Sequence, residues 1–552
     1  MVNSFWVGIQ LFTFYYSLFT VHEAIMETVK LTIDGKEVTT SKEKTVIQAA
    51  AEAGISIPHY CYHPKLSIAG NCRMCLVEIE KMPKLQIACN TQVSDGMGVK
   101  TQSPKVLEAR RAVMEFLLIN HPLDCPICDQ AGECWLQDYY MQHDLMESRL
   151  GDRKQQDRKR ELFGPYVVFD GERCIKCTRC VRFLQEVTHT EELTVVNRTD
   201  HSTIALFPEK ILDNPLSANV NDICPVGALT DRDFRFKVRV WYLQKTPSIC
   251  PGCSTGCNIS VETYQNRIAR FKPRINEEVN GHWICDEGRY CFHGLTEVER
   301  LTSPLIRQEG GLVPADWERA LQAVLAGLGS AQPVAAILSG RNTNEEAFLF
   351  ARLMRRIAPQ VALEVFYQER ALTEVEKILK SPDHSANFRG ARDMGVGPNG
   401  GLDALIQDLL QGRFRGAYIV GEDPLSLIRN PELKAALEKL SFLVVQDIHL
   451  TPTGRVAHVV LPATHFGEKD GTYTNRKGRV QRLHAALVPP PGTLHDWEIF
   501  KRLLALAGEK GVPATPSEIL QQIAAEVPGY QGLSYDRIGA QGIQLGGDAQ
   551  QP

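Results

Sequence analysis

The stretch Cys174-Ile175-Lys176-Cys177-Thr178-Arg179-Cys180 carries three cysteines at two-residue spacing, and a fourth, Cys224, follows later in a Cys-Pro pair. This is the ligand pattern of a [4Fe-4S] cluster, in which a short loop surrounds one face of the cube and a remote cysteine closes it. A four-cysteine zinc site, the alternative, usually presents two separated Cys-x-x-Cys pairs. The pattern therefore predicts an iron-sulfur cluster.

Bacterial two-cluster ferredoxins carry this cysteine run twice and exchange the fourth ligands, so the chain can be searched for a second copy. The same spacing counted back from Cys224 falls on Asn214, Ser217 and Val220, and the first run has Leu184 in its own fourth position. We therefore predict that residues 164–242 form a ferredoxin-like domain that holds one [4Fe-4S] cluster and has lost the other.

Length and cysteine distribution divide the remaining chain. A chain of 552 residues suggests about three or four domains. All sixteen cysteines lie between Cys61 and Cys291, in groups with metal-ligand spacing, which indicates a reducing, intracellular compartment rather than a disulfide scaffold. A net charge of -4 gives no basic surface for nucleic acid.

Residues 26–104 show the pattern of a β-grasp domain. Alternating apolar residues from Val29 to Ile33 run into Asp34-Gly35, which predicts a hairpin. Thr45 and Gln48 then form a capping box for a helix over residues 46–53. Four cysteines follow, and Gly70 is placed to let main-chain N–H groups approach their sulfurs. They suit a [2Fe-2S] cluster, with a zinc ribbon as the alternative: Cys61, Cys72, Cys75 and Cys89.

Residues 105–144 contain a helical pattern from Val106 to Asn120, stopped by Pro122, and then three cysteines. The neighbouring groups are already complete with four cysteines each, so a histidine at the end of the helix is the candidate for the missing ligand. The predicted [4Fe-4S] ligands are His121, Cys125, Cys128 and Cys134. Since imidazole is neutral, this cluster should be easier to reduce than an all-cysteine one. The charged residues 145–163 look like a solvated linker.

Residues 243–300 carry the last cysteine group. The predicted ligands of a third [4Fe-4S] cluster are Cys250, Cys253, Cys257 and Cys285. Cys291 is left over, either as a structural thiol or as an alternative ligand to Cys285.

Residues 301–512 alternate short apolar runs with amphipathic helical patterns, which predicts an open α/β domain with a mainly parallel sheet. The strands are expected at residues 334–338, 417–420, 442–445 and 458–461, and Thr343 with Glu346 should cap a helix. Gly395, Gly397 and Gly400 match a dinucleotide-binding pattern, but no apolar strand leads into them, which favours an ordinary loop.

The two ends of the chain carry weaker signals. Residues 1–25 are apolar but lack the basic and small-residue features of a signal peptide, so we expect a leader or a mis-assigned start. Residues 513–552 are expected to be a C-terminal tail, loose after Tyr530 because Gly and Gln dominate.

With these motifs in order, residues 26 to about 506 resemble the large iron-sulfur subunit of bacterial NADH:quinone oxidoreductase, respiratory complex I. The resemblance implies one [2Fe-2S] and three [4Fe-4S] clusters, followed by a molybdopterin-oxidoreductase-like domain in a short, degenerate form. Residues 467–480 resemble a pterin-contacting stretch, yet no cysteine follows Cys291, so no molybdopterin is expected.

The resemblance also implies a function and partners. The chain would relay electrons from a flavin- and NADH-binding subunit toward quinone-side subunits, without an active site of its own. It would be peripheral to the cytoplasmic side of the bacterial inner membrane. The alternative is an iron-sulfur subunit of an NAD-linked hydrogenase or formate dehydrogenase, against which the cysteine-free C-terminal half argues. A zinc-bearing assembly scaffold is a further, non-redox alternative.

Overall fold

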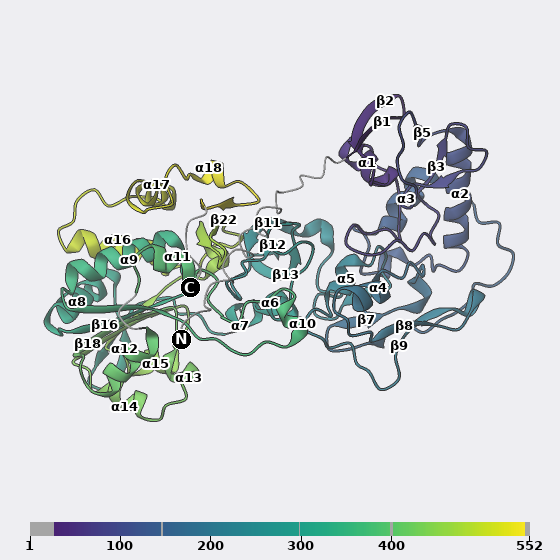
Figure 1. The fold of residues 1–552 in the computed structure, drawn as a ribbon. Coiled ribbons are helices and arrows are strands. Elements are labelled where there is room, and N and C mark those ends of the chain that lie inside the picture. Colours follow the sequence, from purple (N-terminus) through teal and green to yellow (C-terminus); the bar gives the residue numbers. More distant parts are fainter. Residues whose placement is uncertain (1–26, 145–146, 297, 398–400, 547–552) are drawn as a thin grey trace, which may run out of the picture. The chain divides into compact units, whose positions relative to one another are not determined.

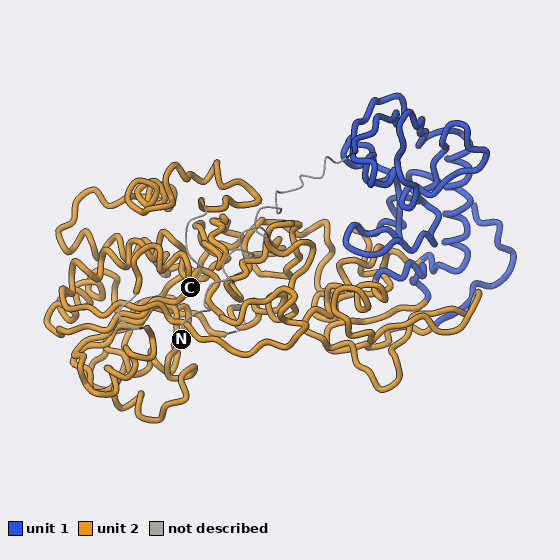
Figure 2. The backbone as a smooth tube through the Cα atoms, viewed as in Figure 1, with its two compact units in different colours: residues 1–123, 134–157, 172–179 blue, residues 124–133, 158–171, 180–552 orange. Residues whose placement is uncertain are grey.

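The computed structural model describes residues 27–144, 147–296, 298–397 and 401–546. The expected leader at residues 1–25 therefore lies outside the described part. The chain divides into two compact units, shown in different colours in Figure 2. Unit 1 takes the described residues of Met1–Leu123, Cys134–Asp157 and Glu172–Arg179, and unit 2 takes Asp124–Glu133, Arg158–Gly171 and Cys180–Pro552.

Unit 1 begins with the predicted β-grasp domain, a sheet in the order β2-β1-β5-β3-β4. Its elements are β1 (Thr28–Ile33), β2 (Lys36–Ser41), α1 (Val46–Glu52), β3 (Leu76–Ile79), β4 (Gln86–Ile87) and β5 (Gly98–Lys100). The hairpin turn is confirmed: Asp34 and Gly35 have φ of +50° and +81°, the left-handed values that a two-residue turn requires. The capping box of Thr45 and Gln48 is also present.

Two helices complete unit 1, α2 (Pro104–Leu118) and α3 (Trp135–His143). The helix predicted from Val106 to Asn120 begins earlier and ends earlier, because Ser103 caps it and Pro104 fits its first turn. The expected linker is partly engaged: Lys154 Nζ donates to the Leu118 and Ile119 carbonyl oxygens at 2.7 Å each, at the end of α2.

The ferredoxin-like part of unit 2 is built on a small antiparallel sheet, β10-β7-β6, and a hairpin, β8-β9. Its elements are β6 (Glu161–Leu162), β7 (Val167–Phe169), α4 (Arg179–Glu186), β8 (Leu193–Val196), β9 (Thr203–Leu206), α5 (Asn219–Ile223) and β10 (Leu229–Asp231). A three-stranded antiparallel sheet and two short helices follow: β11 (Gln244–Ile249), β12 (Asn258–Tyr264), β13 (Arg267–Pro273), α6 (Asp286–Tyr290) and α7 (His293–Thr296).

The predicted α/β domain has a seven-stranded sheet in the order β15-β14-β20-β19-β18-β16-β17, parallel from β20 to β17. Strands β16 and β18 of this sheet are labelled in Figure 1. Its strands are β14 (Leu305–Gln308), β15 (Gly311–Pro314), β16 (Val334–Ser339), β17 (Val361–Phe366), β18 (Gly416–Val420), β19 (Phe442–Asp447) and β20 (Val459–Pro462). The four predicted strands are thus confirmed, while β14, β15 and β17 were missed. The antiparallel pair β14 and β15 forms one edge.

Helices cover both faces of this sheet. Ala336 and Leu338 pack with one group of helices, and the alternate residues Ala335 and Ile337 pack with the other. The first group is α8 (Trp317–Ser330), α9 (Asn344–Ile357), α16 (Asp496–Leu506) and α17 (Pro516–Glu526). The second includes α12 (Leu402–Leu410), α14 (Glu432–Glu438) and α15 (Pro452–Val456). Short helices also occur at α10 (Glu374–Lys377), α11 (Phe388–Asp393) and α13 (Pro424–Leu427).

The expectation of a loose C-terminal tail was wrong for residues up to 546. Helices α17 and α18 (Tyr535–Ile538) and strand β23 (Ile543–Gln544) are formed, and β23 pairs with β22 (Arg479–Leu483), which in turn pairs with β21 (Gly471–Thr474). Ile519, Leu520 and Tyr530 are fully buried in the core of the α/β domain. The apolar residues through which this segment packs on the domain are widely spaced. The prediction from its high Gly and Gln content therefore did not detect them.

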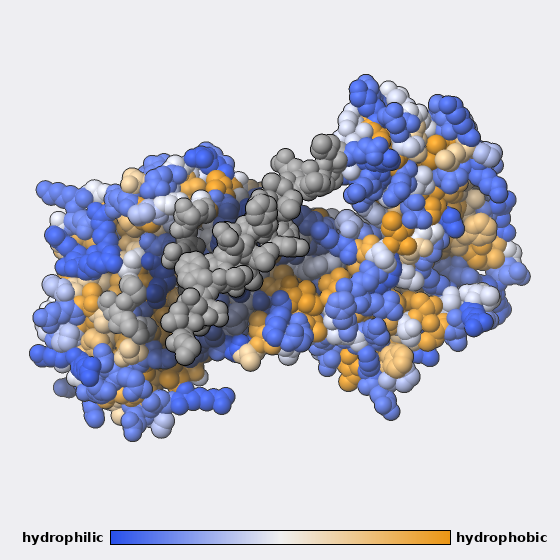
Figure 3. Space-filling model, viewed as in Figure 1, coloured by the Kyte–Doolittle hydropathy of each residue, from blue (hydrophilic) through white to orange (hydrophobic). Residues whose placement is uncertain are grey.

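On the face shown in Figure 3, hydrophilic residues surround smaller apolar patches. Within the described residues, no helix combines the length and the apolar character needed to cross a membrane.

Candidate iron-sulfur cluster sites

The four cysteines predicted for the [2Fe-2S] cluster all belong to unit 1. Cys61, Cys75 and Cys89 are buried and Cys72 is half-buried. Cys72 donates to the Cys61 sulfur and Cys75 to the Cys89 sulfur, so each donor's pKa is raised. The same bond from Cys75 lowers the pKa of Cys89. The structure therefore brings the four thiols together as two adjacent pairs, which fits a site with two irons.

A residue that the sequence reasoning missed lies beside these thiols. Arg110 of α2 is fully buried, and its Nη2 donates to the Leu76 carbonyl at 3.2 Å, next to Cys75. Its Nε and Nη1 have no hydrogen-bond partner within the described chain. Burial lowers its pKa to about 10, while Cys75 opposes that shift, so the guanidinium stays charged. Buried N–H groups of a charged guanidinium without a hydrogen-bond partner suit an anionic group nearby.

Gly70 has φ of +60°, and a Cβ there would lie 3.2 Å from Ile87 Cδ1. A left-handed backbone and a close neighbour are thus sufficient reasons for glycine at this position.

The ligand set with His121 is divided between the units and stays a prediction from the sequence. His121 and Cys134 belong to unit 1, and Cys125 and Cys128 belong to unit 2. Cys134 is the N-cap residue of α3, and Cys125 opens a short 3-10 helix, Cys125–Ile127.

Side chains of unit 2 hold the segment that carries Cys125 and Cys128. Arg239 Nη1 donates to the Cys128 carbonyl at 2.7 Å, and the Phe236 N–H donates to Asp129 at 2.8 Å. At the end of the segment, Glu133 pairs with Arg270 at 2.8 Å.

The Cys174 set is divided in the same way: Cys174 and Cys177 lie in unit 1, Cys180 and Cys224 in unit 2. The backbone conformation of the loop from Cys174 to Cys180 agrees with the short cysteine spacing. Lys176 has φ of +56°, and its N–H donates to the Cys174 sulfur at 3.4 Å. Such left-handed residues turn successive N–H groups toward one point, where they favour an anion. The ligand set as a whole stays a prediction.

The positions of the lost second cluster are filled by packed side chains. Leu184, Ser217 and Val220 are fully buried. Asn214 Nδ2 donates to Glu192 at 2.8 Å, and Ser217 Oγ donates to Asp286 at 2.6 Å. These side chains are engaged in packing and hydrogen bonds, and the loss of a second cluster stays a prediction.

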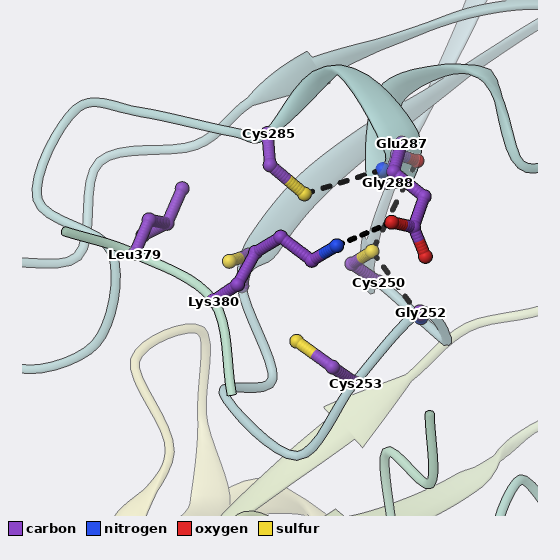
Figure 4. A pocket seen from close by; sticks show the side chains of 9 residues that line it. Cys250, Gly252, Cys253, Cys285, Glu287, Gly288, Leu379 and Lys380 are labelled. Atoms are coloured by element: carbon purple, nitrogen blue, oxygen red, sulfur yellow. Dashed lines mark hydrogen bonds and ion pairs between the residues drawn. The ribbon is translucent and has the colours of Figure 1, made fainter. Parts of the chain in front are cut away.

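The third set forms the clearest site of unit 2. Cys250, Cys253, Cys257 and Cys285 line one pocket, and each is less than a tenth exposed. Figure 4 labels Cys250, Cys253 and Cys285 of this set. The first three come from the turn between β11 and β12, and Cys285 is the N-cap residue of α6. A cube meets each sulfur with a different iron, so its ligands stand around a cavity. Among the described residues no three His, Cys, Asp or Glu side chains are placed to share a single ion.

Main-chain donors and glycine shape this pocket. The Gly252 N–H donates to the Cys250 sulfur at 3.4 Å, and the Gly288 N–H donates to the Cys285 sulfur at 3.3 Å. A Cβ on Gly288 would lie 3.0 Å from the Cys250 sulfur and 3.2 Å from the Cys285 sulfur. Glycine therefore lets α6 approach both sulfurs and present its N–H groups to them.

Burial raises the pKa of Cys253, Cys257 and Cys285 in this pocket. The pKa of Cys250 is raised by a hydrogen bond with Cys291 and by burial. Thiolates here would be costly without a positively charged partner, and iron is such a partner. Cys285 lines the pocket, while Cys291 lies at the C-cap of α6 and hydrogen-bonds Cys250, so the assignment of the fourth ligand to Cys285 stays a prediction.

A segment of the α/β domain closes the pocket, and sequence reasoning missed it. We call residues 379–383 the strap. Thr255 Oγ1 donates to the Leu379 carbonyl at 2.9 Å, and the Ser254 N–H donates to Asp383 at 2.9 Å. Leu379 and Lys380 line the pocket with the cysteines. No spacing rule links the strap to a cysteine loop so far away in the chain.

The interior of the α/β domain contains a second group of polar residues. Lys469, in the stretch that resembles a pterin-contacting segment, pairs with Glu346 at 2.8 Å and Asp496 at 2.9 Å, all three buried. Burial lowers the pKa of Lys469, but Asp496 and Glu346 outweigh it and the net shift is upward. Thr472 donates to Glu345 through its N–H at 2.9 Å.

The carboxyl ends of the parallel strands are the usual place for a ligand in such a sheet. Here Ser339 Oγ, at the end of β16, donates to Glu422 at 2.6 Å, and Arg341 pairs with Glu422 at 3.1 Å. The glycine pattern lies elsewhere: helix α11 precedes Gly395, whose carbonyl accepts from Arg355 at 2.6 Å. Gly400 lies outside the described residues. A helix in place of a strand agrees with the ordinary-loop interpretation.

Five family models match the chain in the order of its parts. They are the 2Fe-2S iron-sulfur cluster binding domain (residues 26–104), the NADH-ubiquinone oxidoreductase-G iron-sulfur binding region (110–149), the ferredoxin-like domain of NADH-quinone oxidoreductase subunit 3 (164–230), the molybdopterin oxidoreductase Fe4S4 domain (243–295) and molybdopterin oxidoreductase (300–375 and 374–506).

The chain is similar to whole proteins as well. It is 43% identical to the NADH-quinone oxidoreductase G subunit of Rickettsia felis over 331 residues, which are 60% of this chain and 49% of that protein. The match thus spans about half the length of that relative. The chain is 34% identical to the mitochondrial NADH-ubiquinone oxidoreductase 78 kDa subunit of Neurospora crassa over 604 aligned positions, covering 87% of this chain and 81% of that protein.

A chain in a crystal structure of an NAD+-reducing [NiFe]-hydrogenase in the H2-reduced state is 30% identical, covers 38% of this chain and 91% of that chain, and has a TM-score of 0.35. A TM-score this low supports no conclusion about the architecture or function of the whole chain.

Proposed function

Because the chain belongs to the family of the NADH-quinone oxidoreductase G subunit and the 78 kDa subunit of NADH-ubiquinone oxidoreductase, we propose that it is an electron-relay subunit of such a complex. Electrons would enter from a flavin- and NADH-binding partner and leave toward quinone-side partners. The chain would be peripheral to the cytoplasmic side of the inner membrane, held there by its partners, and would bind no nucleic acid.

The observation that carries this proposal is the Cys250 pocket. Four buried thiols surround one cavity, and two main-chain N–H groups donate to their sulfurs. Gly288 occupies a position at which a side chain would come too close to two of these sulfurs. A [4Fe-4S] cluster, when bound, supplies one-electron redox chemistry at this site. The chain's part is to hold the ligands, to bury them and to donate to the sulfurs, which together set the potential.

We further propose the full set of cofactors, one [2Fe-2S] and three [4Fe-4S] clusters. Their ligands would be Cys61, Cys72, Cys75 and Cys89; His121, Cys125, Cys128 and Cys134; Cys174, Cys177, Cys180 and Cys224; and Cys250, Cys253, Cys257 and Cys285. The matched cluster-binding domains and the pairing of the first four thiols support this assignment.

The α/β domain would be a degenerate molybdopterin-oxidoreductase domain that holds no molybdopterin. Lys469 and Thr472 are buried and donate to Glu346, Asp496 and Glu345 of the same chain. Donors already paired in this way are not directed at a cofactor, which supports the proposal.

Metal analysis of the anaerobically purified full-length protein tests the cluster assignment. About fourteen irons per chain are expected from one [2Fe-2S] and three [4Fe-4S] centres. Stoichiometric zinc would contradict it. His121→Ala should remove one cluster and leave three, and His121→Cys should keep that cluster but lower its potential, because thiolate adds negative charge. Unchanged EPR signals in both variants would show that His121 is not a ligand.

Partner dependence tests the relay. NADH should bleach the clusters only after a flavoprotein partner is added, whereas dithionite should reduce the chain alone. Rapid reduction by NADH without the partner would contradict the proposal, and the loop at Gly395 would then be the first place to search for a nucleotide site.

A further inference from the structure

One charged side chain of the α/β domain lies in the Cys250 pocket. Lys380, in the strap, has a side chain only 4% exposed and lines the pocket with the four cysteines. In Figure 4 its side chain extends through the pocket toward Glu287. The strap around it is fixed, because Leu379 accepts from Thr255, Asp383 accepts from Ser254, and the Ser381 main chain hydrogen-bonds Cys253.

Two carboxylates hold the ammonium in place. Lys380 Nζ contacts Glu287, which lies two residues after Cys285 in α6, and lies 3.2 Å from Glu376 Oε1 of α10. Arg370 bridges the same two carboxylates, at 3.3 Å from Glu287. His384 also reaches Glu287, at 3.3 Å.

Both members of the nearest pair face charged partners. Glu287 contacts Lys380, Arg370 and His384. Burial lowers the pKa of Lys380, but Glu287 outweighs it and the net shift is upward. Lys380 lines the same pocket as the four cysteines. Its charge therefore lies close to the proposed ligand sulfurs.

A buried charge is screened far less than an exposed one, because low-dielectric surroundings separate it from water. One-electron reduction adds one negative charge to a four-thiolate cluster and makes or breaks no bond in the chain. A fixed cation nearby stabilises that added charge and raises the potential, and a fixed anion lowers it.

We propose that Lys380 is a positioning residue that raises the reduction potential of the cluster held by the Cys250 pocket, and that Glu287 lowers it. This inference rests on the proposed function, because it requires a [4Fe-4S] cluster at these cysteines. It assigns the α/β domain a present role: the domain supplies the strap that closes the pocket and the cation that adjusts its charge.

The test is an EPR-monitored redox titration of the anaerobically purified full-length protein, with dithionite as electron donor. Cys257→Ala first identifies the signal of this cluster as the one that disappears, and the other three signals serve as internal references. Lys380→Met should shift the midpoint potential of this signal downward. Glu287→Gln should shift it upward, and Lys380→Arg should keep it close to the original value.

Lys377→Met is the matched control. Lys377 lies three residues before Lys380, at the end of α10, and pairs with Glu374, but its side chain is 56% exposed. Glu287 is 46% exposed but lines the pocket, whereas Lys377 is not among the lining residues. The same loss of charge at Lys377 should therefore be screened by water and leave the potential unchanged. The double variant Lys380→Met with Glu287→Gln should fall between the two single variants.

An unshifted potential in Lys380→Met with the cluster retained would overturn the proposal. So would shifts of the same sign in Lys380→Met and Glu287→Gln, because those would reflect altered packing rather than charge. If Lys380→Met loses the cluster, Glu287→Gln decides alone: an upward shift supports the proposal and no shift overturns it. Absence of this signal and its irons from the unmodified protein would instead contradict the proposed function.

Discussion

Two buried polar regions of unit 2, the Cys250 pocket and the interior around Lys469, differ in how their donors are used. In the pocket, four thiols face a cavity, and the N–H groups of Gly252 and Gly288 donate to sulfur. In the interior, the ammonium group of Lys469 forms ion pairs with Glu346 and Asp496 of the same chain. The contrast teaches that buried polar residues indicate a binding site only when their bonding capacity is not already used within the chain.

Removal of a pocket cysteine should give the largest effect. Cys257→Ala should lose the whole cluster of this pocket, about four irons per chain, because the cube needs all four thiolates. Iron analysis and EPR measure the loss. Cys291→Ala is the control, since Cys285 lines the pocket. An equal loss of iron in Cys291→Ala, with iron retained in Cys285→Ala, would make Cys291 the ligand instead.

A substitution in the interior around Lys469 should change the free energy of unfolding rather than the iron content. Lys469→Met leaves the buried carboxylates of Glu346 and Asp496 without their cation, which should cost about 3 to 5 kcal/mol. Hydrogen exchange of α9 and β21 should accelerate while the iron content stays the same. The control is Lys434→Met, whose side chain is 64% exposed. Iron loss in Lys469→Met would show that the two regions are coupled.

The interior should also make stability depend on pH. Burial raises the pKa of Glu345 to about 7 from an ordinary value of 4.5, so the folded chain binds the proton more tightly than the unfolded chain. Stability should therefore fall as pH rises from about 4.5 to 7, by up to about 3 kcal/mol, and stay at the lower level above that range.

Glu345→Gln should remove this contribution to the pH dependence, since glutamine does not ionise, while Asp447, whose pKa burial also raises to about 7, keeps its own. Thermal unfolding midpoints at pH 5 and pH 8 measure it, and the variant should gain relative to the unmodified protein at pH 8. Glu432→Gln, at an exposed position in α14, is the control. A variant whose midpoints follow the unmodified protein at both pH values would contradict the assignment to Glu345.

The filled second ferredoxin site should give the smallest effect. Ser217→Ala removes a hydrogen bond to the buried carboxylate of Asp286, which still accepts from the Ala218 N–H at 3.0 Å. We expect a loss of about 1 to 2 kcal/mol and no loss of iron. Ser441→Ala, at an exposed position, is the matched control. A fall in iron content in Ser217→Ala would mean that this site still supports a cluster.

The amino-acid sequence by itself determined the features that short-range physics controls. The Asp34-Gly35 turn and the capping boxes at Thr45 and Thr343 depend on residues within four positions of one another, and all three are present. The cysteine spacings belong to the same class, because a loop of fixed length can place its thiols around only a few kinds of metal group. For the Cys250 set, the structure gathers the predicted cysteines in one pocket.

Only the tertiary structure decided which distant residues complete each site. Lys380 reaches the Cys285 end of the pocket through the strap, and Arg110 reaches Cys75 from α2. Helix α17 docks on the α/β core through a few widely spaced apolar residues. Such contacts depend on how whole elements pack, because burial of apolar area and pairing of buried charges are summed over the fold and leave no fixed spacing in the chain.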